Sequence, residues 1–475
     1  MPMPAANSLE TLPLQVFREY DIRGKANTEI GRAFAYLLGR ALAGKLHTNG
    51  CNTLVIGRDN RASSPDLHHA LVAGVHQTPI NVIDVGEVTS PMLYYALEHL
   101  GEHAGVMITA SHNPADENGF KIVMNKANVY GPAMMRLRDD MRHMLTNEGV
   151  PRKYHWDMHK IQRYDIATPY MEMLENKIKL KGKPLKVVVD CGNGTASSYA
   201  PRMLERWGCE VIPLYCESDP TFPNHHPDPV EPANLRDLIR HVREHGADVG
   251  LAFDGDGDRL GVVDERGDIV WGDRLMIVYL REIFARHPGI EVPIEVKCSK
   301  TLIDEVERHG GRPFFHRTGH SHMKATMKQK KLLFAGEMSG HLYFRDDYFG
   351  YDDALYAAGR LLRVLSASSE PLSALLADVP QLPVTPETRL PCREEDKARI
   401  VSAVASHFRE RGSEVIDTDG ARILFPDGWG LIRHSNTQSI LVLRAEADTE
   451  EALRRIKRDM ADVLADPSID LRLDW

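Results

Sequence analysis

A strand-like segment followed by a helix-like segment recurs three times along this chain. Apolar runs typical of short buried strands occupy residues 53–59, 185–194 and 294–298. The helical patterns that follow these runs cover residues 66–74, 196–207 and 301–309. Buried strands alternating with amphipathic helices indicate α/β units with parallel or mixed sheets. The units are too long and too dissimilar to form a short-period solenoid.

The length of 475 residues exceeds what one hydrophobic core usually supports, so three or four domains are expected. Polar or proline-rich seams lie near residues 151–165, 268–271 and 379–386. Beyond the last seam, expected helices at 395–411 and 450–464 accompany β runs at 421–425 and 439–444, which indicates a smaller α+β domain. The predicted domains are residues 1–160, 161–269, 270–383 and 384–475.

The composition of the chain limits the kinds of partner that it can bind. The formal net charge of −9 argues against nonspecific binding to nucleic acid or to an anionic membrane surface. An anionic substrate would therefore need a local cationic pocket. The six cysteines form no CxxC pair, and residues 1–7 lack the pattern of a signal peptide. No apolar run is long enough to span a bilayer, so we expect a cytoplasmic protein without nucleic-acid or membrane partners.

A serine at the end of an apolar run is the first candidate for chemistry. The segment GVMITASHNP places Ser111 among Thr, His, Asn and Pro, and Lys121 follows nearby. Such a pattern predicts a strand that delivers a hydroxyl group to a tightly shaped loop. A lone loop serine is usually a turn former, but the dense turn chemistry around Ser111 favours a functional role.

Three alternating carboxylates form the second candidate site. The segment DGDGDR carries Asp254, Asp256 and Asp258, and apolar runs enter and leave it. The intervening glycines allow a curled backbone, so the three carboxylates can converge on a hard cation such as Mg²⁺. A calcium loop would need glycine where Arg259 stands and helices at its flanks. A phosphatase with Asp254 as nucleophile is a further reading of the same segment.

Two more polar turns suit a phosphorylated sugar. GEMSGH at 336–341 combines two glycines with a Glu, a Ser and a His, whose side chains could hydrogen-bond the vicinal hydroxyls of a sugar. RHSNT at 433–437 combines a guanidinium with two hydroxyls and an amide, which suits phosphate oxygens. A serine that can carry phosphate, together with a cation site, indicates phosphoryl transfer.

Taken together, the four segments resemble the α-D-phosphohexomutase superfamily, in particular its bacterial phosphomannomutase/phosphoglucomutase branch. TASHNP is similar to the phosphoserine loop, DGDGDR to the metal loop, GEMSGH to the sugar-recognition loop, and RHSNT to the phosphate-binding loop. All four occur in the family's order. Asn436, where phosphoglucosamine mutases carry glycine, favours the dual mannose/glucose type. Ser439 and His434 depart from residues that are common in relatives.

The resemblance implies three related α/β domains with mixed sheets plus a C-terminal α+β domain of TATA-binding-protein-like topology, arranged around a central cleft. It also implies reversible phosphoryl transfer between the 1- and 6-positions of hexose phosphates, through phosphoserine and a hexose 1,6-bisphosphate that serves as intermediate and activator. Hexose phosphates would be the only partners of a monomer or homodimer.

Residue roles follow from the same resemblance. One Mg²⁺ per chain would be held by Ser111, Asp254, Asp256 and Asp258. Candidates for catalysis besides Ser111 are Lys121, Arg23 and His320. Substrate binding is implied for Tyr20, Arg259, Lys297, Glu337, Ser339, His341, Arg433, Ser435, Asn436 and Thr437. Two alternatives remain open at this point: a phosphatase that releases free phosphate, and a phosphosugar- or calcium-binding protein without turnover.

Overall fold

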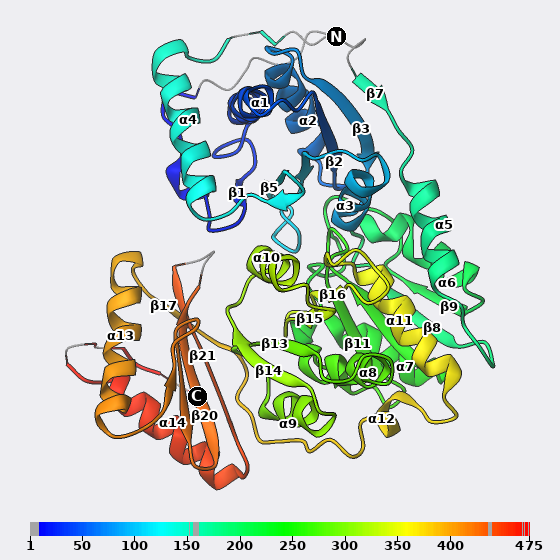
Figure 1. Cartoon of the computed structure of the whole chain (residues 1–475), viewed down its shortest axis with the longest axis vertical. Coiled ribbons are helices and arrows are strands. Elements are labelled where there is room, and N and C mark those ends of the chain that lie inside the picture. The colour runs from blue at the N-terminus through cyan, green and yellow to red at the C-terminus, as the bar shows by residue number, and fades with distance from the viewer. Residues whose placement is uncertain are drawn as a thin grey trace.

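The structure is a computed structural model that describes residues 9–151, 153–154, 161–435, 439–467, 469, 471–473 and 475. The chain passes through four sheet-containing units in sequence order, coloured from blue to red in Figure 1. Within the described ranges, no helix combines the length and the apolar character needed to cross a membrane.

The first unit is a mixed sheet with helices on both faces. Its strands run in the order β1 (Ile22–Lys25), β5 (Glu117–Met124), β4 (Gly105–Ile108), β2 (Thr53–Arg58), β3 (Asn81–Glu87) and β7 (Ile161–Arg163), with β6 (Ala127–Asn128) paired to β5. Helices α1 (Arg32–Thr48), α2 (Ser64–Val75) and α4 (Pro132–Glu148) share one core cluster, and α3 (Ser90–His99) belongs to another. Val55 and Ile56 point into different clusters, as alternation along a strand requires.

The second unit is also mixed. Its strands run in the order β12 (Ile269–Val270), β11 (Leu260–Asp264), β10 (Val249–Phe253), β8 (Lys186–Asp190) and β9 (Glu210–Leu214). The last three are parallel, and β11 is antiparallel to β10. The unit's helices are α5 (Ala167–Lys177), α6 (Ala200–Arg206) and α7 (Arg236–His245). The helix expected at 196–207 starts late, because Pro201 lies in the first turn of α6 and a 3-10 turn precedes it.

The third unit has two short sheets. The pair β13 (Glu291–Glu295) and β14 (Arg312–His316) is parallel, and the pair β15 (Phe334–Gly336) and β16 (Leu342–Phe344) is antiparallel, with β15 beside β13. Its helices are α8 (Gly272–Phe284), α9 (Lys300–Arg308), α10 (His320–Lys330), α11 (Ala354–Ala367) and α12 (Leu372–Leu375). One hydrophobic cluster includes α3, α5, α6, α8 and α11, so it joins the first three units.

The fourth unit is an antiparallel sheet with both helices on one face. The strand order is β17 (Thr388–Pro391), β21 (Ile440–Ala447), β20 (Gly428–His434), β19 (Ala421–Phe425) and β18 (Val415–Ile416). Helices α13 (Glu394–Glu410) and α14 (Glu450–Leu464) pack with this sheet in a core of their own. The final helix expected at 450–464 is confirmed. From the other face, Arg422 donates hydrogen bonds to the carbonyl oxygens of Val296 (2.7 Å) and Cys298 (2.8 Å) in the third unit.

Helices α1 and α2 approach each other through glycines, which gives a test of the packing. A Cβ on Gly74 would lie 2.1 Å from the carbonyl oxygen of Tyr36, and a Cβ on Gly39 would lie 2.1 Å from that of Leu71. We therefore expect Gly74→Ala to lower the free energy of unfolding by about 1–3 kcal/mol, since the helix backbones must separate. Calorimetric melting of the whole chain measures the effect.

The matched control for this substitution is Gly44→Ala in α1, where an added Cβ meets no atom within 4 Å. This variant should be neutral or more stable by up to about 1 kcal/mol, because alanine has the higher helix propensity. Equal melting temperatures for the two variants would contradict the assigned packing.

Candidate active site

Ser111 lies in a tightly held loop after β4. Its φ of 54° is in the left-handed region that serine rarely adopts. Its backbone N–H donates to Thr109 Oγ1 at 2.8 Å, and its hydroxyl group donates to Asp254 Oδ2 at 2.7 Å. His112 Nδ1 lies 3.1 Å from the same hydroxyl. The serine predicted to carry phosphate is thus fixed in contact with the first of the three aspartates.

Arg61, which the sequence analysis did not single out, holds the Ser111 loop from behind. The side chain is fully buried, and its Nε lies 3.1 Å from Asp59 Oδ2. The guanidinium donates to four backbone carbonyl oxygens, those of Ser111 (2.8 Å), Asn113 (2.6 Å), Pro114 (2.5 Å) and Glu117 (3.0 Å). In the sequence, the only local sign of this role is that two charged residues, Asp59 and Arg61, come directly after a buried strand.

Asp254, Asp256 and Asp258 are fully buried between β10 and β11 and present ligand atoms within 4.8 Å of one another. Lys121 Nζ lies 2.5 Å from Asp256 Oδ2 and 2.6 Å from Asp258 Oδ2. Burial and the neighbouring carboxylates hold the pKa of Asp254 well above its usual range. Burial also opposes ionisation of Asp256, but Lys121 outweighs it and lowers that pKa.

The aspartates fit a hard divalent cation. Among the described residues, Asp256 Oδ1 and Asp258 Oδ1 are buried without a hydrogen-bond partner. Unpaired buried carboxylate oxygens are costly unless a cation binds them. Oxygen donors at this density are the ligands that divalent cations of the Mg²⁺ class prefer. The sequence prediction that these three side chains come together is confirmed by their positions.

The sugar-loop segment forms the turn between β15 and β16. Glu337 is 2% exposed, and its Oε1 accepts a hydrogen bond from Tyr343 at 2.9 Å. Burial, together with the negative charge of Glu295, raises the pKa of Glu337. Gly340 has φ 87°, and a Cβ there would lie 2.5 Å from the Leu260 carbonyl oxygen. The turn therefore requires glycine to bring the sugar loop against the start of β11.

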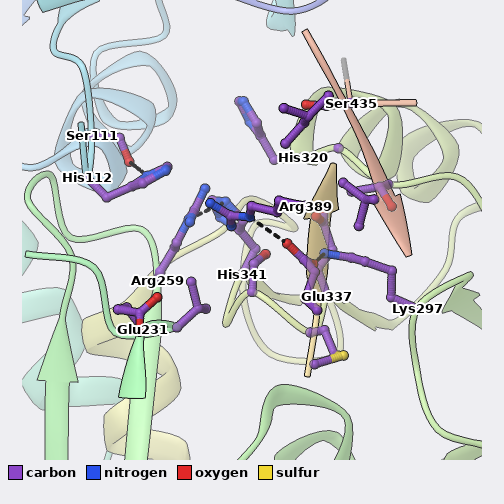
Figure 2. Close-up of a pocket in the computed structure, with 18 of the residues that line it drawn as sticks. Ser111, His112, Glu231, Arg259, Lys297, His320, Glu337, His341, Arg389 and Ser435 are labelled. Carbon is purple, nitrogen blue, oxygen red and sulfur yellow. Dashed lines mark hydrogen bonds and ion pairs between the residues drawn. The ribbon is translucent and has the colours of Figure 1, made fainter. Parts of the chain in front are cut away.

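Two histidines lie side by side in the site, His320 at the start of α10 and His341 at the end of the sugar loop. The rings of His320 and His341 stack with centroids 5.5 Å apart, and Tyr20 meets His320 edge-on at 4.9 Å. Arg259 Nε donates to His341 Nε2 at 3.0 Å (Figure 2). Burial and the charge of Lys324 hold the pKa of His320 well below its usual range, so this imidazole is neutral at neutral pH.

Cationic side chains close the site toward the fourth unit. Lys297 Nζ lies 3.2 Å from Glu387 and 3.5 Å from Glu295. Arg433 Nε donates to Asp419 Oδ2 at 2.9 Å, whereas its Nη2 is buried without a partner among the described residues. That nitrogen is available for a phosphate oxygen. Ser435 lies beside Arg433, and the predicted Asn436 and Thr437 fall outside the described residues.

A cavity of about 1090 Å³ connects these groups. The following residues that the sequence predicted for catalysis or substrate binding line it: Tyr20, Arg23, Ser111, Lys121, Arg259, Lys297, His320, Glu337, Ser339, His341, Arg433 and Ser435. Nine Lys or Arg residues face five Glu residues in its wall, so the cavity is cationic although the whole chain is acidic. This is the local cationic pocket expected for an anionic substrate.

Several lining residues were not predicted: His112, Glu231, Thr318, Arg389 and Arg444. In the fourth sheet, Val442 of β21 pairs with Arg389 on one side and Arg433 on the other. Directly opposed residues of an antiparallel sheet point to the same face, and so does Arg444 two positions along β21. This face was not evident in the sequence, because it depends on the register of three separate strands.

The metal-binding interpretation leads to a measurable expectation. Mg²⁺ should raise the melting temperature of the protein. At a free Mg²⁺ concentration 100 times the dissociation constant, the free energy of unfolding should increase by about 2.7 kcal/mol. Asp256→Asn removes one negative charge and should weaken Mg²⁺ binding in isothermal titration calorimetry. Asp273→Asn, at another buried aspartate outside the cavity, is the control and should bind as the wild type does. Unchanged binding in Asp256→Asn would contradict the site.

Comparison with known proteins agrees with this geometry. Four family models match in order: "Phosphoglucomutase/phosphomannomutase, alpha/beta/alpha domain I" at 14–141, domain II at 168–267, domain III at 271–382, and the C-terminal domain at 387–463. A phosphomannomutase/phosphoglucomutase of Pseudomonas aeruginosa is 43% identical over 447 residues, which is 94% of this chain and 95% of that protein. A phosphoglucomutase of Neisseria meningitidis serogroup A is 41% identical over 94% of this chain and 96% of its own.

A solved structure is similar over the same extent. The crystal structure of a phosphoglucomutase/phosphomannomutase family protein from Burkholderia thailandensis superposes with a TM-score of 0.86. It is 38% identical in sequence, and the match covers 95% of this chain and 97% of that one. The similarity therefore extends over all four units.

Proposed function

The chain belongs to the phosphoglucomutase/phosphomannomutase family, and from this premise we propose that it moves a phosphoryl group reversibly between the 1- and 6-positions of hexose phosphates. Its substrates are mannose phosphates, and glucose phosphates in addition. The observation that carries the proposal is the hydrogen bond between the Ser111 hydroxyl group and Asp254 at the edge of a cationic cavity.

Ser111, carrying phosphate, is the group donor in this proposal. Its Oγ–P bond breaks while a new P–O bond forms to the free hydroxyl of the hexose phosphate, which yields a hexose 1,6-bisphosphate. The bisphosphate turns round in the cavity, and its other phosphate returns to Ser111. The cationic wall offsets the charge of the transferring group, so positioning and electrostatics supply most of the catalysis.

Asp254, Asp256 and Asp258, with an oxygen of phosphorylated Ser111, would hold one Mg²⁺. The ion supplies positive charge at the phosphoryl group. The contact between Ser111 and Asp254 and the unpaired oxygens of the other two aspartates support this assignment.

The proton of the attacking hydroxyl needs an acceptor, and His320 suits that role best among the three candidates. Lys121 is engaged by two carboxylates, and Arg23 donates to Asp21 at 2.6 Å and to Asn113 at 3.0 Å. His320 is neutral, and both its nitrogens lack a hydrogen-bond partner among the described residues. A neutral imidazole that lines the cavity can accept a proton from substrate.

The far wall of the cavity serves the parts of the substrate that do not react. Glu337 and Ser339 grip ring hydroxyls, and Arg433 with Ser435 holds the second phosphate through the unpaired Nη2. Because all four units of one chain line the cavity, a monomer is sufficient for the reaction. The six cysteines are free thiols, which supports a reducing, cytoplasmic setting.

A phosphatase with Asp254 as nucleophile fits the geometry less well. Asp254 Oδ1 accepts backbone hydrogen bonds from Asp258 and Arg259, each at 3.0 Å, and Oδ2 accepts from Ser111. Ser111 faces the cavity, and Asp254 lies behind it. A nucleophile needs access to phosphorus, and Ser111 has that access.

The test is ³¹P NMR of mannose 1-phosphate incubated with the protein, Mg²⁺ and a trace of hexose 1,6-bisphosphate. The wild type should produce a 6-phosphate signal, and Ser111→Ala should lose at least about 1000-fold in rate because no phosphoryl donor remains. Ser197→Ala, a buried serine outside the cavity, is the control and should turn over normally. Free phosphate as the main product, or full activity of Ser111→Ala, would refute the proposal.

A further inference from the structure

A buried carboxylate that has no part in the proposed chemistry lies directly behind the two histidines. Asp352 precedes α11, is fully buried, and forms an isolated β-bridge with Tyr343 that fixes its backbone. It does not line the cavity. It lies close to His320 and His341, which do line the cavity, so it is a candidate for acting on the site through these residues.

Asp352 divides its two oxygens between different partners. Oδ1 accepts a hydrogen bond from Lys324 Nζ at 2.8 Å. Oδ2 lies 3.0 Å from His341 Nδ1 and 3.8 Å from His320 Nδ1. One carboxylate oxygen therefore faces both stacked imidazoles, and the other is occupied by a buried cation.

The hydrogen bond from Arg259 fixes the tautomer of His341. A guanidinium can only donate, so His341 Nε2 must accept the Arg259 Nε–H at 3.0 Å. A neutral imidazole has one donor and one acceptor, so Nδ1 carries the proton. The groups around Nδ1 agree with this, because its two near neighbours are carboxylate oxygens of Asp352 at 3.0 Å and Asp258 at 3.6 Å.

We propose that Asp352 is a positioning residue for the phosphoryl transfer: it holds His341 in the Nδ1–H form, so that Nε2 keeps Arg259 at the cavity wall, and it aligns His320 beside it. The inference rests on the proposed function. The Arg259 backbone N–H also donates to Asp254, so the residue joins the metal loop to the sugar loop through its side chain. Figure 2 shows Arg259, His341 and His320 around the centre of the cavity.

The arrangement requires a carboxylate at position 352. Asparagine has the same shape but one acceptor oxygen, whereas Lys324 on one side and the His341 Nδ1–H on the other each need an acceptor. In Asp352→Asn either Lys324 or His341 faces an amide donor. His341 is then free to shift its proton or its ring, and Arg259 loses its fixed acceptor.

The test compares Asp352→Asn with Asp353→Asn, the same substitution at the next residue. Asp353 is equally buried, but it accepts hydrogen bonds from Tyr170 and Tyr348 instead of facing the histidines. For Asp352→Asn we expect kcat in the ³¹P or coupled assay to fall by about 10- to 100-fold, with KM within roughly threefold of wild type. Asp353→Asn should retain kcat even if its melting temperature falls.

A spectroscopic readout separates positioning from folding. In protein labelled with ¹⁵N-histidine, the His341 signals, assigned by their loss in His341→Gln, should show a protonated Nδ1 and an unprotonated Nε2 in the wild type. Asp352→Asn should lose this pattern, and Asp353→Asn should keep it. A wild-type His341 with a protonated Nε2 overturns the inference without reference to any variant.

The outcomes distinguish this inference from the proposed function. If the wild type has no mutase activity, the proposed function fails, and the ¹⁵N pattern still decides whether Asp352 sets the tautomer. If the wild type is active and Asp352→Asn matches it in kcat, the positioning role is wrong. An equal loss of kcat in Asp352→Asn and Asp353→Asn also overturns the positioning role, because the loss would then come from a general disturbance of the loop.

Discussion

The ion pairs between Lys121 and the carboxylates of Asp256 and Asp258 connect the metal site to the docking of the first two units. Lys121 belongs to β5, and the aspartates follow β10. Three carboxylates removed from water repel one another with little screening, so a buried cation must offset them. Removing one partner of such a pair typically costs about 3–5 kcal/mol. The interface of the two units and the site for a divalent cation therefore form together.

The same junction sets the position of Ser111 from both sides. Arg61 holds the carbonyl groups of its loop within the first unit, and Asp254 of the second unit accepts its hydroxyl group. A Cβ on Gly255 would lie 2.4 Å from the Ser111 carbonyl oxygen, so the two loops are in direct backbone contact. The left-handed conformation of Ser111 persists because these neighbours over-determine it. The position of Ser111 is therefore fixed by the interface between the first and the second unit.

Features that are local in sequence were predictable, and features that depend on pairing between distant segments were not. The alternation of aspartate and glycine predicts convergence of Asp254, Asp256 and Asp258 without knowledge of the rest of the chain. Helix α14 begins at Glu450 and ends at Leu464, as its apolar periodicity predicts. Arg61 and Asp352 could not be assigned, because Arg61 holds carbonyl groups 50 to 56 residues away and Asp352 accepts from Lys324, 28 residues away on another element. Two short sheets in the third unit also depend on tertiary pairing.

The distribution of charge around the cavity explains how one site can serve both ends of a sugar. In the proposed function, phosphate would bind at two separate places, the metal loop with Ser111 and the arginine face of the fourth sheet, and the sugar loop lines the same cavity. The cavity, at about 1090 Å³, is larger than the roughly 300–1,000 Å³ of common ligand pockets. A hexose bisphosphate therefore has room to turn round while either phosphate stays close to cationic groups. Retention by charge, combined with space for rotation, is what a reversible transfer between the two ends of one molecule requires.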